Sequence, residues 1–444
     1  MDTLQPPTKT IESLHAIFSK GATICTDTRK VTAGCIFFAL KGERFDGNLF
    51  VEKALEAGAV AAVADAPSLS SNANVFVVPD ALTCLQQLAL HHRKSMKIPF
   101  VAITGSNGKT TTKELVGRVL AKKYRTVYTQ GNLNNHIGVP LTLLSVRDEH
   151  QIAIIEMGAN HRHEIAFLCS LALPTHVLIT NVGLAHLEGF GGFEGVKLGK
   201  GEMYTYAKGN DSLVFLNHDN QHLQSMLGSC DRVFTYGTAP TCEVIGVPEI
   251  DSKYASLQWK TPSMESWRRL NTNIAGSYNF ENIMAAIAVG THFGVDINDI
   301  DDAITSYIPD NQRSQEIKFG SNLVILDAYN ANPTSMEAAI KNFHANIPGD
   351  KMIFLGEMLE LGTSAESEHK RILGLALETE AQFIIAVGKN FSNLSEQFND
   401  SRIIYLNDSS AAADWLKSKT LKNQSILIKG SRGSKMELVL DAFK

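Results

Sequence analysis

A glycine-rich turn at residues 105–112 combines the residue types that bind phosphate groups. Gly105 and Gly108 let the backbone bend tightly, and Lys109 follows directly. Successive backbone N–H groups in such a turn, together with the start of the next helix, attract phosphate oxygens. Lys109 can neutralise the charge of the outer phosphates, and a threonine hydroxyl can hold Mg²⁺. The turn therefore predicts a site for a nucleoside triphosphate, formed by Gly105, Ser106, Asn107, Gly108, Lys109, Thr110 and Thr111.

The match of this turn to the general phosphate-loop pattern is imperfect. That pattern places a glycine where this chain has Ile103. A strand–helix turn that binds nothing is the alternative interpretation. The apolar run at 100–103, which is typical of a buried strand, and the lysine and hydroxyls after the turn favour phosphate binding.

Three further side chains lie near predicted strands. Glu156 ends an apolar run at 152–155, and a carboxylate there suits Mg²⁺, which favours oxygen ligands. A helix cap or a surface carboxylate is an equal alternative. His186 also follows a strand, with either a metal-binding or a structural role. Lys200 lies in a predicted helix, and its residue type predicts that it is exposed.

Polar residues follow two strands near the end of the chain. Asp327 follows the run at 323–326, and Lys429 follows the run at 426–428. Ligands of parallel sheets bind outside the carboxyl ends of the strands, so we expect a polar rim that could close over a nucleotide. A simple turn and a solvated basic loop are the alternatives. Arg313 lies at an expected domain junction, where it could approach a transferring phosphoryl group.

The spacing of apolar runs predicts an α/β protein with three domains, because 444 residues exceed what one core holds. We expect a small N-terminal α/β domain at 1–97, with strands at 35–40, 60–64 and 75–78 and helices at 50–57 and 81–94. The polar segment 91–99 is interpreted as a linker, with His91 and His92 solvated at the end of a helix.

The rest of the chain predicts two larger domains. A central domain at 98–309, similar to P-loop ATPases, has a mostly parallel sheet with strands at 152–155, 177–179 and 213–216 and an irregular, antiparallel edge within 242–267. A C-terminal Rossmann-like domain at 310–444 has strands at 323–326, 352–355, 383–387 and 426–428, a spacing that is typical of βαβ units. The boundary is expected at 309–313.

Composition excludes several classes of function. The net charge of −5 argues against non-specific nucleic-acid binding. The six cysteines form no Cys-x-x-Cys pair, which favours reduced thiols over a zinc or redox site. We find no signal-peptide pattern and no apolar run near the ~20 residues that span a bilayer. We therefore expect a cytoplasmic protein without nucleic-acid partners or stable membrane insertion.

The phosphate loop at 104–110 resembles that of the Mur ligases, the ATP-dependent amide-forming ligases of peptidoglycan precursor synthesis, and that of folylpolyglutamate synthases. The resemblance to Mur ligases covers nearly the whole chain and all three domains. The segment at 39–47 resembles the UDP-sugar segment of the family's N-terminal domain. Five narrower segments resemble the member that adds D-alanyl-D-alanine; they lie at 131–140, 156–160, 186–190, 327–333 and 356–362. The Tyr-Asn-Ala-Asn-Pro run at 329–333 discriminates best, since the member that adds the third residue usually has a different sequence there.

This resemblance implies ligation of D-Ala-D-Ala to UDP-MurNAc-tripeptide through an acyl phosphate, with ATP and Mg²⁺ as cofactors. The partners would be these small molecules, and we expect a monomer. Two alternatives stay open at this point. One is a ligase with another substrate, either a third-residue-adding Mur ligase or a folate polyglutamylase. The other is a nucleotide-driven conformational switch or motor without an acyl substrate.

The resemblance also assigns roles to residues. Catalytic roles fall on Lys109, Lys200, His186 and Arg313. ATP contacts fall on the seven loop residues and on Asn279, Asn282, Arg313 and Asp327. Metal contacts fall on Thr110, Thr111, Glu156, His186 and, if carbamylated, Lys200. Substrate contacts fall on Asp27, Thr28, Arg29, Lys41, Asn134, Asn135, Tyr329, Asn330, Asn332, Lys429, Ser431 and Arg432. Three residues depart from the usual pattern of the family. Thr28 stands where serine is usual, His136 where an acidic residue is common, and Ala328 where serine is common.

Overall fold

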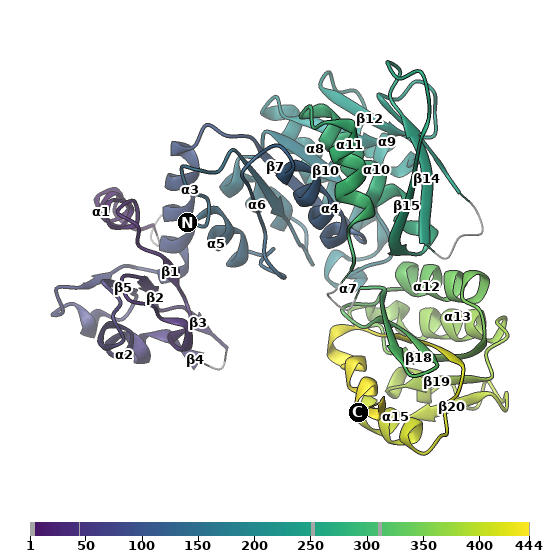
Figure 1. Cartoon of the computed structure of the whole chain (residues 1–444). Helices are drawn as coiled ribbons and strands as arrows, with labels where there is room; N and C mark the ends of the chain where they lie inside the picture. Colours follow the sequence, from purple (N-terminus) through teal and green to yellow (C-terminus); the bar gives the residue numbers. More distant parts are fainter. Residues whose placement is uncertain (1–4, 44, 250–253, 310–312, 444) are drawn as a thin grey trace.

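Three α/β domains follow one another along the chain (Figure 1). The computed structural model describes residues 5–43, 45–249, 254–309 and 313–443. The expected boundary at 309–313 includes residues 310–312, which lie outside this description. The three-domain α/β architecture predicted from the sequence is confirmed. Among the described residues, no helix is long and apolar enough to cross a membrane.

The N-terminal domain has a four-stranded parallel sheet in the order β1-β2-β5-β6. Its strands are β1 (Ile24–Cys25), β2 (Ile36–Phe38), β5 (Ala61–Ala64) and β6 (Val75–Val77), with a small antiparallel pair β3 (Lys41–Gly42) and β4 (Phe45–Asp46). The helices are α1 (Thr8–Phe18), α2 (Val51–Glu56) and α3 (Ala81–Ser95). The three predicted strands and both predicted helices are confirmed.

The expected linker at 91–99 is wrong in its first half, because α3 continues to Ser95. His92 is buried rather than solvated; its Nε2 lies 2.9 Å from the carbonyl oxygen of Val146 and its Nδ1 lies 3.2 Å from His15 Nε2. Arg93 is buried too and donates hydrogen bonds to the carbonyls of Ala172 and Leu173. Helix α3 thus packs on α1 of the N-terminal domain and on α5 and α6 of the central domain.

The central domain is built on a nine-stranded sheet in the order β15-β14-β13-β12-β11-β10-β7-β9-β8. The parallel strands are β7 (Phe100–Thr104), β8 (Thr126–Tyr128), β9 (Ile152–Glu156), β10 (His176–Ile179), β11 (Leu213–Asn217), β12 (Val233–Gly237) and β13 (Val244–Pro248). Strands β14 (Tyr254–Lys260) and β15 (Arg268–Ala275) pair antiparallel, which confirms the expected antiparallel edge. Strands β8 and β12 were not predicted.

Helices cover both faces of this sheet. They are α4 (Lys109–Ala121), α5 (Gly138–Leu143), α6 (Glu164–Ala172), α7 (Leu187–Phe190), α8 (Phe193–Gly209), α9 (Gln221–Leu227), α10 (Phe280–His292) and α11 (Ile297–Thr305). Strand β7 is buried throughout, as expected for the interior of a parallel sheet. Val101 and Ile103 face the core under α4 and α10, whereas Ala102 faces the core under α6 and α8.

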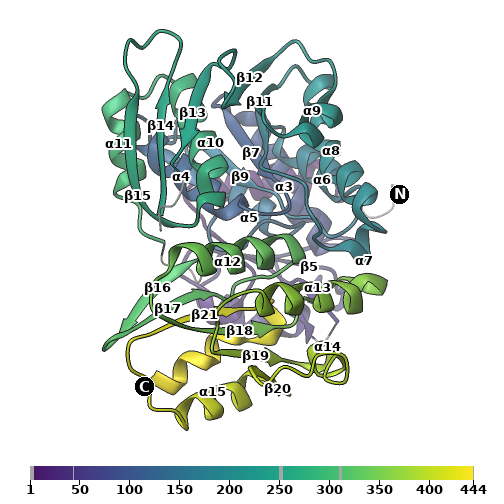
Figure 2. The ribbon, with the colours of Figure 1, turned by 90° about the vertical axis from the view of Figure 1, so that its right-hand side faces the viewer.

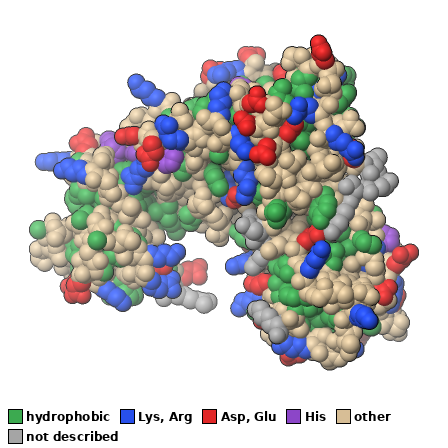
Figure 3. Space-filling view, viewed as in Figure 1, with side chains coloured by type: hydrophobic (Ala, Val, Ile, Leu, Met, Phe, Trp, Pro, Cys, Tyr) green, Lys and Arg blue, Asp and Glu red, His purple; other side chains and the backbone are tan. Residues whose placement is uncertain are grey.

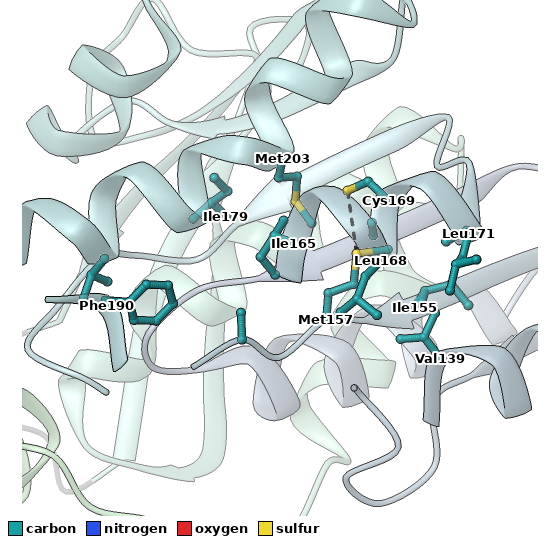
Figure 4. Close-up of a cluster of buried hydrophobic side chains, with 14 of the residues drawn as sticks. Val139, Ile155, Met157, Ile165, Leu168, Cys169, Leu171, Ile179, Phe190 and Met203 are labelled. Carbon is teal, nitrogen blue, oxygen red and sulfur yellow. Dashed lines mark hydrogen bonds between the residues drawn. The ribbon is translucent and has the colours of Figure 1, made fainter. Parts of the chain in front are cut away.

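The core under α6 and α8 carries the walls of the site described below (Figure 4). Met157 follows β9 and its sulfur lies 3.8 Å from the thiol of Cys169 on α6. Ile165 and Met203 pack beside them, and Phe190, the last residue of α7, lies at one end of the cluster. The apolar packing fixes the backbone from which the polar side chains project.

The C-terminal domain has a six-stranded sheet in the order β16-β17-β21-β18-β19-β20, parallel except for the pair β16/β17. Its strands are β16 (Gln315–Phe319), β17 (Asn322–Asp327), β18 (Asp350–Gly356), β19 (Phe383–Val387), β20 (Ile403–Leu406) and β21 (Gln424–Lys429). Its α-helices are α12 (Pro333–Asn346), α13 (Ala365–Leu377), α14 (Lys389–Ser392) and α15 (Ser409–Lys417). Helix α12 lies between this sheet and the central domain (Figure 2). Strands β16 and β20 were not predicted.

Candidate active site

The phosphate loop between β7 and α4 is a close-fitting turn. Gly105 and Gly108 adopt φ values of 145° and 79°, a region that favours glycine. A Cβ on Gly105 would lie 2.0 Å from Thr180 Oγ1, and one on Gly108 would lie 2.3 Å from Asn282 Oδ1. Neighbouring elements therefore press on the turn from two sides, and both positions require glycine.

The side chain of Lys109 folds back over this loop. Its Nζ donates hydrogen bonds to the carbonyls of Gly105 at 2.7 Å and Ser106 at 3.3 Å. Burial lowers the pKa of Lys109 to about 8; the Glu156 carboxylate opposes this shift, and the charge of Arg313 makes a smaller contribution to it. The ammonium group is thus held over the loop that would receive phosphate.

Glu156 ends β9 and is 1% exposed. Thr110 Oγ1 donates to its Oε2 at 3.0 Å, and Asn134 Nδ2 donates to its Oε1 at 2.8 Å. Within the described ranges, no group of three or more His, Cys, Asp or Glu side chains is placed to hold a metal ion. A metal here would have to share its coordination with hydroxyl, phosphate or water oxygens, as Mg²⁺ does.

The expectation that Lys200 is exposed is wrong, because Lys200 is buried and only 1% exposed. Its Nζ donates to the carbonyl of Ala159 at 3.2 Å and lies 5.3 Å from the centre of the Phe190 ring. Burial lowers its pKa well below the usual value, and the charge of Lys109 adds to this effect. Burial therefore favours the uncharged form of this amine, and an uncharged amine is a nucleophile.

His186 lies immediately before α7 and meets the C-terminal domain. Its Nδ1 is hydrogen-bonded to Glu360 Oε2. Hydrogen bonding to His186 lowers the pKa of Glu360 against the opposing effect of burial. Glu360 was not among the predicted site residues, although the segment at 356–362 had been singled out.

Residues at the carboxyl ends of β17 and β21 complete the wall formed by the C-terminal domain. Lys429 Nζ lies 2.5 Å from Asp327 Oδ2. The guanidinium of Arg313 lies 4.0 Å from the centre of the Tyr329 ring. Asn332 Nδ2 donates to Asn107 Oδ1 at 2.8 Å, so the C-terminal domain touches the phosphate loop directly. The expected polar rim is confirmed as a structural feature.

Asn279 and Asn282 support the loop from the side of α10. Asn282 Nδ2 donates to Asn279 Oδ1 at 2.8 Å, and Thr112 Oγ1 donates to Asn282 Oδ1 at 3.1 Å. Both asparagines are buried. Asn181, which sequence reasoning missed, accepts a hydrogen bond from the backbone N–H of Asn107 at 3.0 Å.

These side chains surround a cavity of about 1200 Å³ between the central and C-terminal domains. Its lining includes the following predicted residues: Ser106, Asn107, Gly108, Lys109, Thr110, Thr111, Asn134, Asn135, Glu156, His186, Asn279, Asn282, Arg313, Asp327, Tyr329, Asn330, Asn332 and Lys429. A second cavity of about 390 Å³ shares His186 and Tyr329 with the first and adds Glu360, Ser431 and Arg432. The volume of the first suits a nucleotide together with part of a second ligand.

The predicted residues of the N-terminal domain stand apart from both cavities. Asp27 pairs with Arg29 at 2.7 Å, and Lys41 pairs with Asp65 at 2.7 Å. Thr28 lies between the first two and is half-buried. A wide hollow separates the N-terminal and C-terminal domains, with basic side chains on both sides (Figure 3).

Comparison with known families agrees with this geometry in all three domains. Residues 22–93 match the model "Mur ligase family, catalytic domain", residues 103–290 match "Mur ligase middle domain", and residues 312–432 match "Mur ligase, glutamate ligase domain". Together these matches cover most of the chain.

Individual relatives are similar over nearly their full length. The UDP-N-acetylmuramoyl-tripeptide–D-alanyl-D-alanine ligase of Bacillus subtilis is 36% identical over 94% of this chain and 92% of the relative. The enzyme of the same name from Escherichia coli is 35% identical over 95% and 93%. A crystal structure of MurF from Acinetobacter baumannii matches with a TM-score of 0.85 at 31% identity, covering 99% of both chains. MurF ligase from Thermotoga maritima in complex with ADP matches with a TM-score of 0.82 at 26% identity, covering 96% and 97%.

Proposed function

This chain belongs to the Mur ligase family, and we propose that it joins D-alanyl-D-alanine to UDP-N-acetylmuramoyl-tripeptide, giving the UDP-linked pentapeptide, ADP and phosphate. It is an ATP-dependent peptide ligase of peptidoglycan precursor synthesis. The observation that carries this function is the full-length similarity to ligases of that name. The geometry agrees, because the phosphate loop and the polar ends of β17 and β21 face one cavity.

The chemistry follows from the poor reactivity of a carboxylate. An oxygen of the tripeptide carboxylate attacks the γ-phosphorus of ATP, the bond to the bridging oxygen breaks, and ADP leaves. The amine of the dipeptide then attacks the acyl phosphate, loses a proton and expels inorganic phosphate. Backbone N–H groups of the loop and Lys109 stabilise the phosphate charge, with Arg313 approaching from the C-terminal domain. The contact of Asn332 with the loop helps to exclude water from the acyl phosphate.

We propose that Mg²⁺ is held by Thr110, Thr111, Glu156 and His186. The donor set fits, because the buried Glu156 carboxylate and the Thr110 hydroxyl lie side by side at the loop. When bound, Mg²⁺ offsets the repulsion between the carboxylate and the phosphates. The protein's own part is to hold Glu156 in one orientation through Thr110 and Asn134.

We propose that Lys200 completes this site as a carbamate. Its uncharged amine would attack CO₂, form an N–C bond and release one proton. The burial of Lys200 and the lowered pKa support this step. After growth with ¹³C-bicarbonate, a carbamate resonance should appear in wild-type protein and in Lys197→Ala, a lysine on the same helix, but not in Lys200→Ala. A spectrum without a carbamate resonance would exclude the modification under those conditions.

The remaining substrate contacts are proposals of the same kind. Asp27, Thr28, Arg29 and Lys41 would bind the nucleotide-sugar, whose diphosphate suits the basic sides of the hollow in Figure 3. Asn134 and Asn135 would contact the same substrate near Glu156. The dipeptide would contact Tyr329, Asn330, Asn332, Lys429, Ser431 and Arg432 around the smaller cavity. Asn279, Asn282 and Asp327 would contact ATP.

The organisation and setting of the protein are proposed as follows. The domains span 1–97, 98–309 and 310–444, and the protein acts as a cytoplasmic monomer. All six cysteines are free thiols, which agrees with a reducing compartment.

The function is tested by phosphate release from ATP with the purified protein. Release should require both UDP-MurNAc-tripeptide and D-Ala-D-Ala, and mass spectrometry should detect the pentapeptide. Single amino acids, including glutamate with a folate acceptor, should not replace the dipeptide. Equal ATP hydrolysis without any acceptor would contradict ligation and favour a nucleotide-driven switch.

A further inference from the structure

Two residues with left-handed backbone conformations meet across the interface between the central and C-terminal domains. His186 has φ 53° and Glu360 has φ 62°, a conformation that non-glycine residues adopt at a cost. Their side chains are hydrogen-bonded to each other, through His186 Nδ1 and Glu360 Oε2. Because both residues adopt a costly backbone conformation where they meet, we infer that the surrounding structure holds them in this contact.

The backbone around Glu360 is docked as well as its side chain. The N–H of Glu188 donates to the carbonyl of Glu360 at 3.2 Å. Gly362, at the start of the short 3-10 helix η6 (Gly362–Ser364), approaches so closely that a Cβ there would lie 3.3 Å from Glu188 Cβ. Leu361, the residue between Glu360 and Gly362 in the sequence, is buried. The segment that carries Glu360 is thus fixed against α7. Helix α13, which follows this segment, lies next to α7 in Figure 2.

The pair contributes little to folding stability, which points to another role. The His186 side chain is 20% exposed and that of Glu360 is 52% exposed. Exposed pairs of this kind are screened by water. Orientation of the imidazole is the property that such a contact controls best.

The position of the proton on the His186 ring decides which of its two nitrogens can bind a metal ion. Because the carboxylate accepts a hydrogen bond from Nδ1, the proton of the neutral ring is fixed on Nδ1 and the lone pair lies on Nε2. A carboxylate behind a histidine in this way also holds the ring plane and raises the basicity of the other nitrogen. His186 lines the large cavity, so the prepared nitrogen belongs to the candidate active site.

We propose that Glu360 is a positioning residue that prepares His186 to bind the metal ion. This inference rests on the proposed function, which makes His186 a metal ligand. Glu360 comes from the C-terminal domain and His186 from the central domain, so the correct tautomer of His186 exists when the two domains are docked. Docking and metal binding are thereby coupled through one hydrogen bond.

The first test reads the tautomer directly, without catalysis. In full-length protein with ¹⁵N-labelled histidine, the signal of His186 is assigned by its loss in His186→Asn. The wild type should show the Nδ1–H tautomer, and Glu360→Ala should shift the ring toward the Nε2–H form. Glu360→Gln keeps an oxygen acceptor and should retain the wild-type tautomer. Glu188→Gln, a carboxylate of the same interface, is the matched control.

The second test measures Mn²⁺ binding in the presence of ADP by electron paramagnetic resonance. Glu360→Ala should weaken the affinity about tenfold, as for other residues that orient metal-bound histidines, and Glu360→Gln should restore most of it. In turnover, kcat should fall while KM for the tripeptide substrate stays constant. If Glu360→Ala does not fold, Glu360→Gln and Glu360→Asp replace it. The variant that accepts the hydrogen bond from His186 Nδ1 better should then bind Mn²⁺ more tightly.

The outcomes separate this inference from the proposed function. An unchanged tautomer and unchanged Mn²⁺ affinity in Glu360→Ala would overturn the role of Glu360 even in an active ligase. A shifted tautomer with weakened Mn²⁺ binding would support that role, even in a protein that ligates another substrate.

Discussion

Asn332 of the C-terminal domain donates a hydrogen bond of 2.8 Å to Asn107 in the phosphate loop. The same side chain caps α12, because its Oδ1 accepts from the N–H of Ser335 at 2.9 Å. One amide group thus begins a helix with its oxygen and links two domains with its nitrogen. The contact places α12 over the site that would hold the triphosphate.

Asn332→Asp separates these two roles. Aspartate caps helices as well as asparagine, so the thermal midpoint should change little. It offers an acceptor to Asn107 Oδ1 where the wild type offers a donor. Loss of a hydrogen bond is worth about 1 kcal/mol, so ADP should bind about fivefold more weakly by calorimetry. Equal affinity with an unchanged midpoint would show that the contact does not support the nucleotide site.

Gly108→Ala should impair the loop. The new Cβ would meet Asn282 Oδ1 at 2.3 Å, at a residue with φ 79°. We expect a cost of about 1–3 kcal/mol, seen as a lower thermal midpoint or as ADP binding weakened by tenfold or more. Gly209→Ala is the control, because the end of α8 has open space at that position. A Gly108→Ala protein that matched the control in both measurements would contradict the close fit of the loop.

Lys109→Ala should abolish most of the activity. The ammonium group held over the loop is lost, and groups that stabilise transition-state charge contribute about 100- to 1,000-fold in kcat. Phosphate release with both substrates measures the effect, and Lys122→Ala, just past the other end of α4, should stay near wild type. Pentapeptide formation by Lys109→Ala at the wild-type rate would refute the phosphate-loop interpretation.

His176→Phe should reduce the loss of stability in acid. Burial, with smaller effects from His292 and Arg232, lowers the pKa of His176 to about 3. Below the usual pKa near 6.5 the unfolded chain binds a proton that the folded state rejects, so stability falls as pH falls from about 6.5 toward 3.

At pH 5 this histidine should account for about 2 kcal/mol of that loss. Urea unfolding at pH 7 and pH 5 compares wild type with His176→Phe, a replacement that retains the aromatic packing on Phe215 and Phe293. His163→Asn is the control, since its side chain is 82% exposed. Parallel losses in His176→Phe and wild type would place the acid sensitivity elsewhere.

The positions of the loop, of Glu156 at the end of its strand and of the polar ends of the C-terminal strands were predictable because their signals are local. A buried apolar run followed by glycines and a lysine specifies a strand, a turn and a helix within a few residues. The short strands β8, β12, β16 and β20 were missed, since their pairing depends on distant neighbours in the sheets.

Lys200 and His92 were misplaced for a different reason. Each was interpreted from its residue type, but each lies on the apolar stripe of its helix. Lys200 shares a face with Val196, Met203 and Ala207, all of which are buried. Leu85, Leu88 and Ala89 place His92 on the buried face of α3 in the same way. The spacing of apolar residues along each helix therefore indicated that Lys200 and His92 are buried. The pairing of His186 with Glu360, in contrast, depends on how two domains dock, and no local sequence pattern indicates it.

The course of α3 limits where the polypeptide can be divided. A fragment that began at residue 98 would strip α5 and α6 of the helix that covers them, and would leave the carbonyls of Ala172 and Leu173 without the Arg93 guanidinium. Cleavage before Asp80, whose carboxylate caps α3, would leave this covering helix attached to the central domain. The N-terminal and central domains thus share one helix in their packing, so neither domain can be separated from the other without exposing part of its own core.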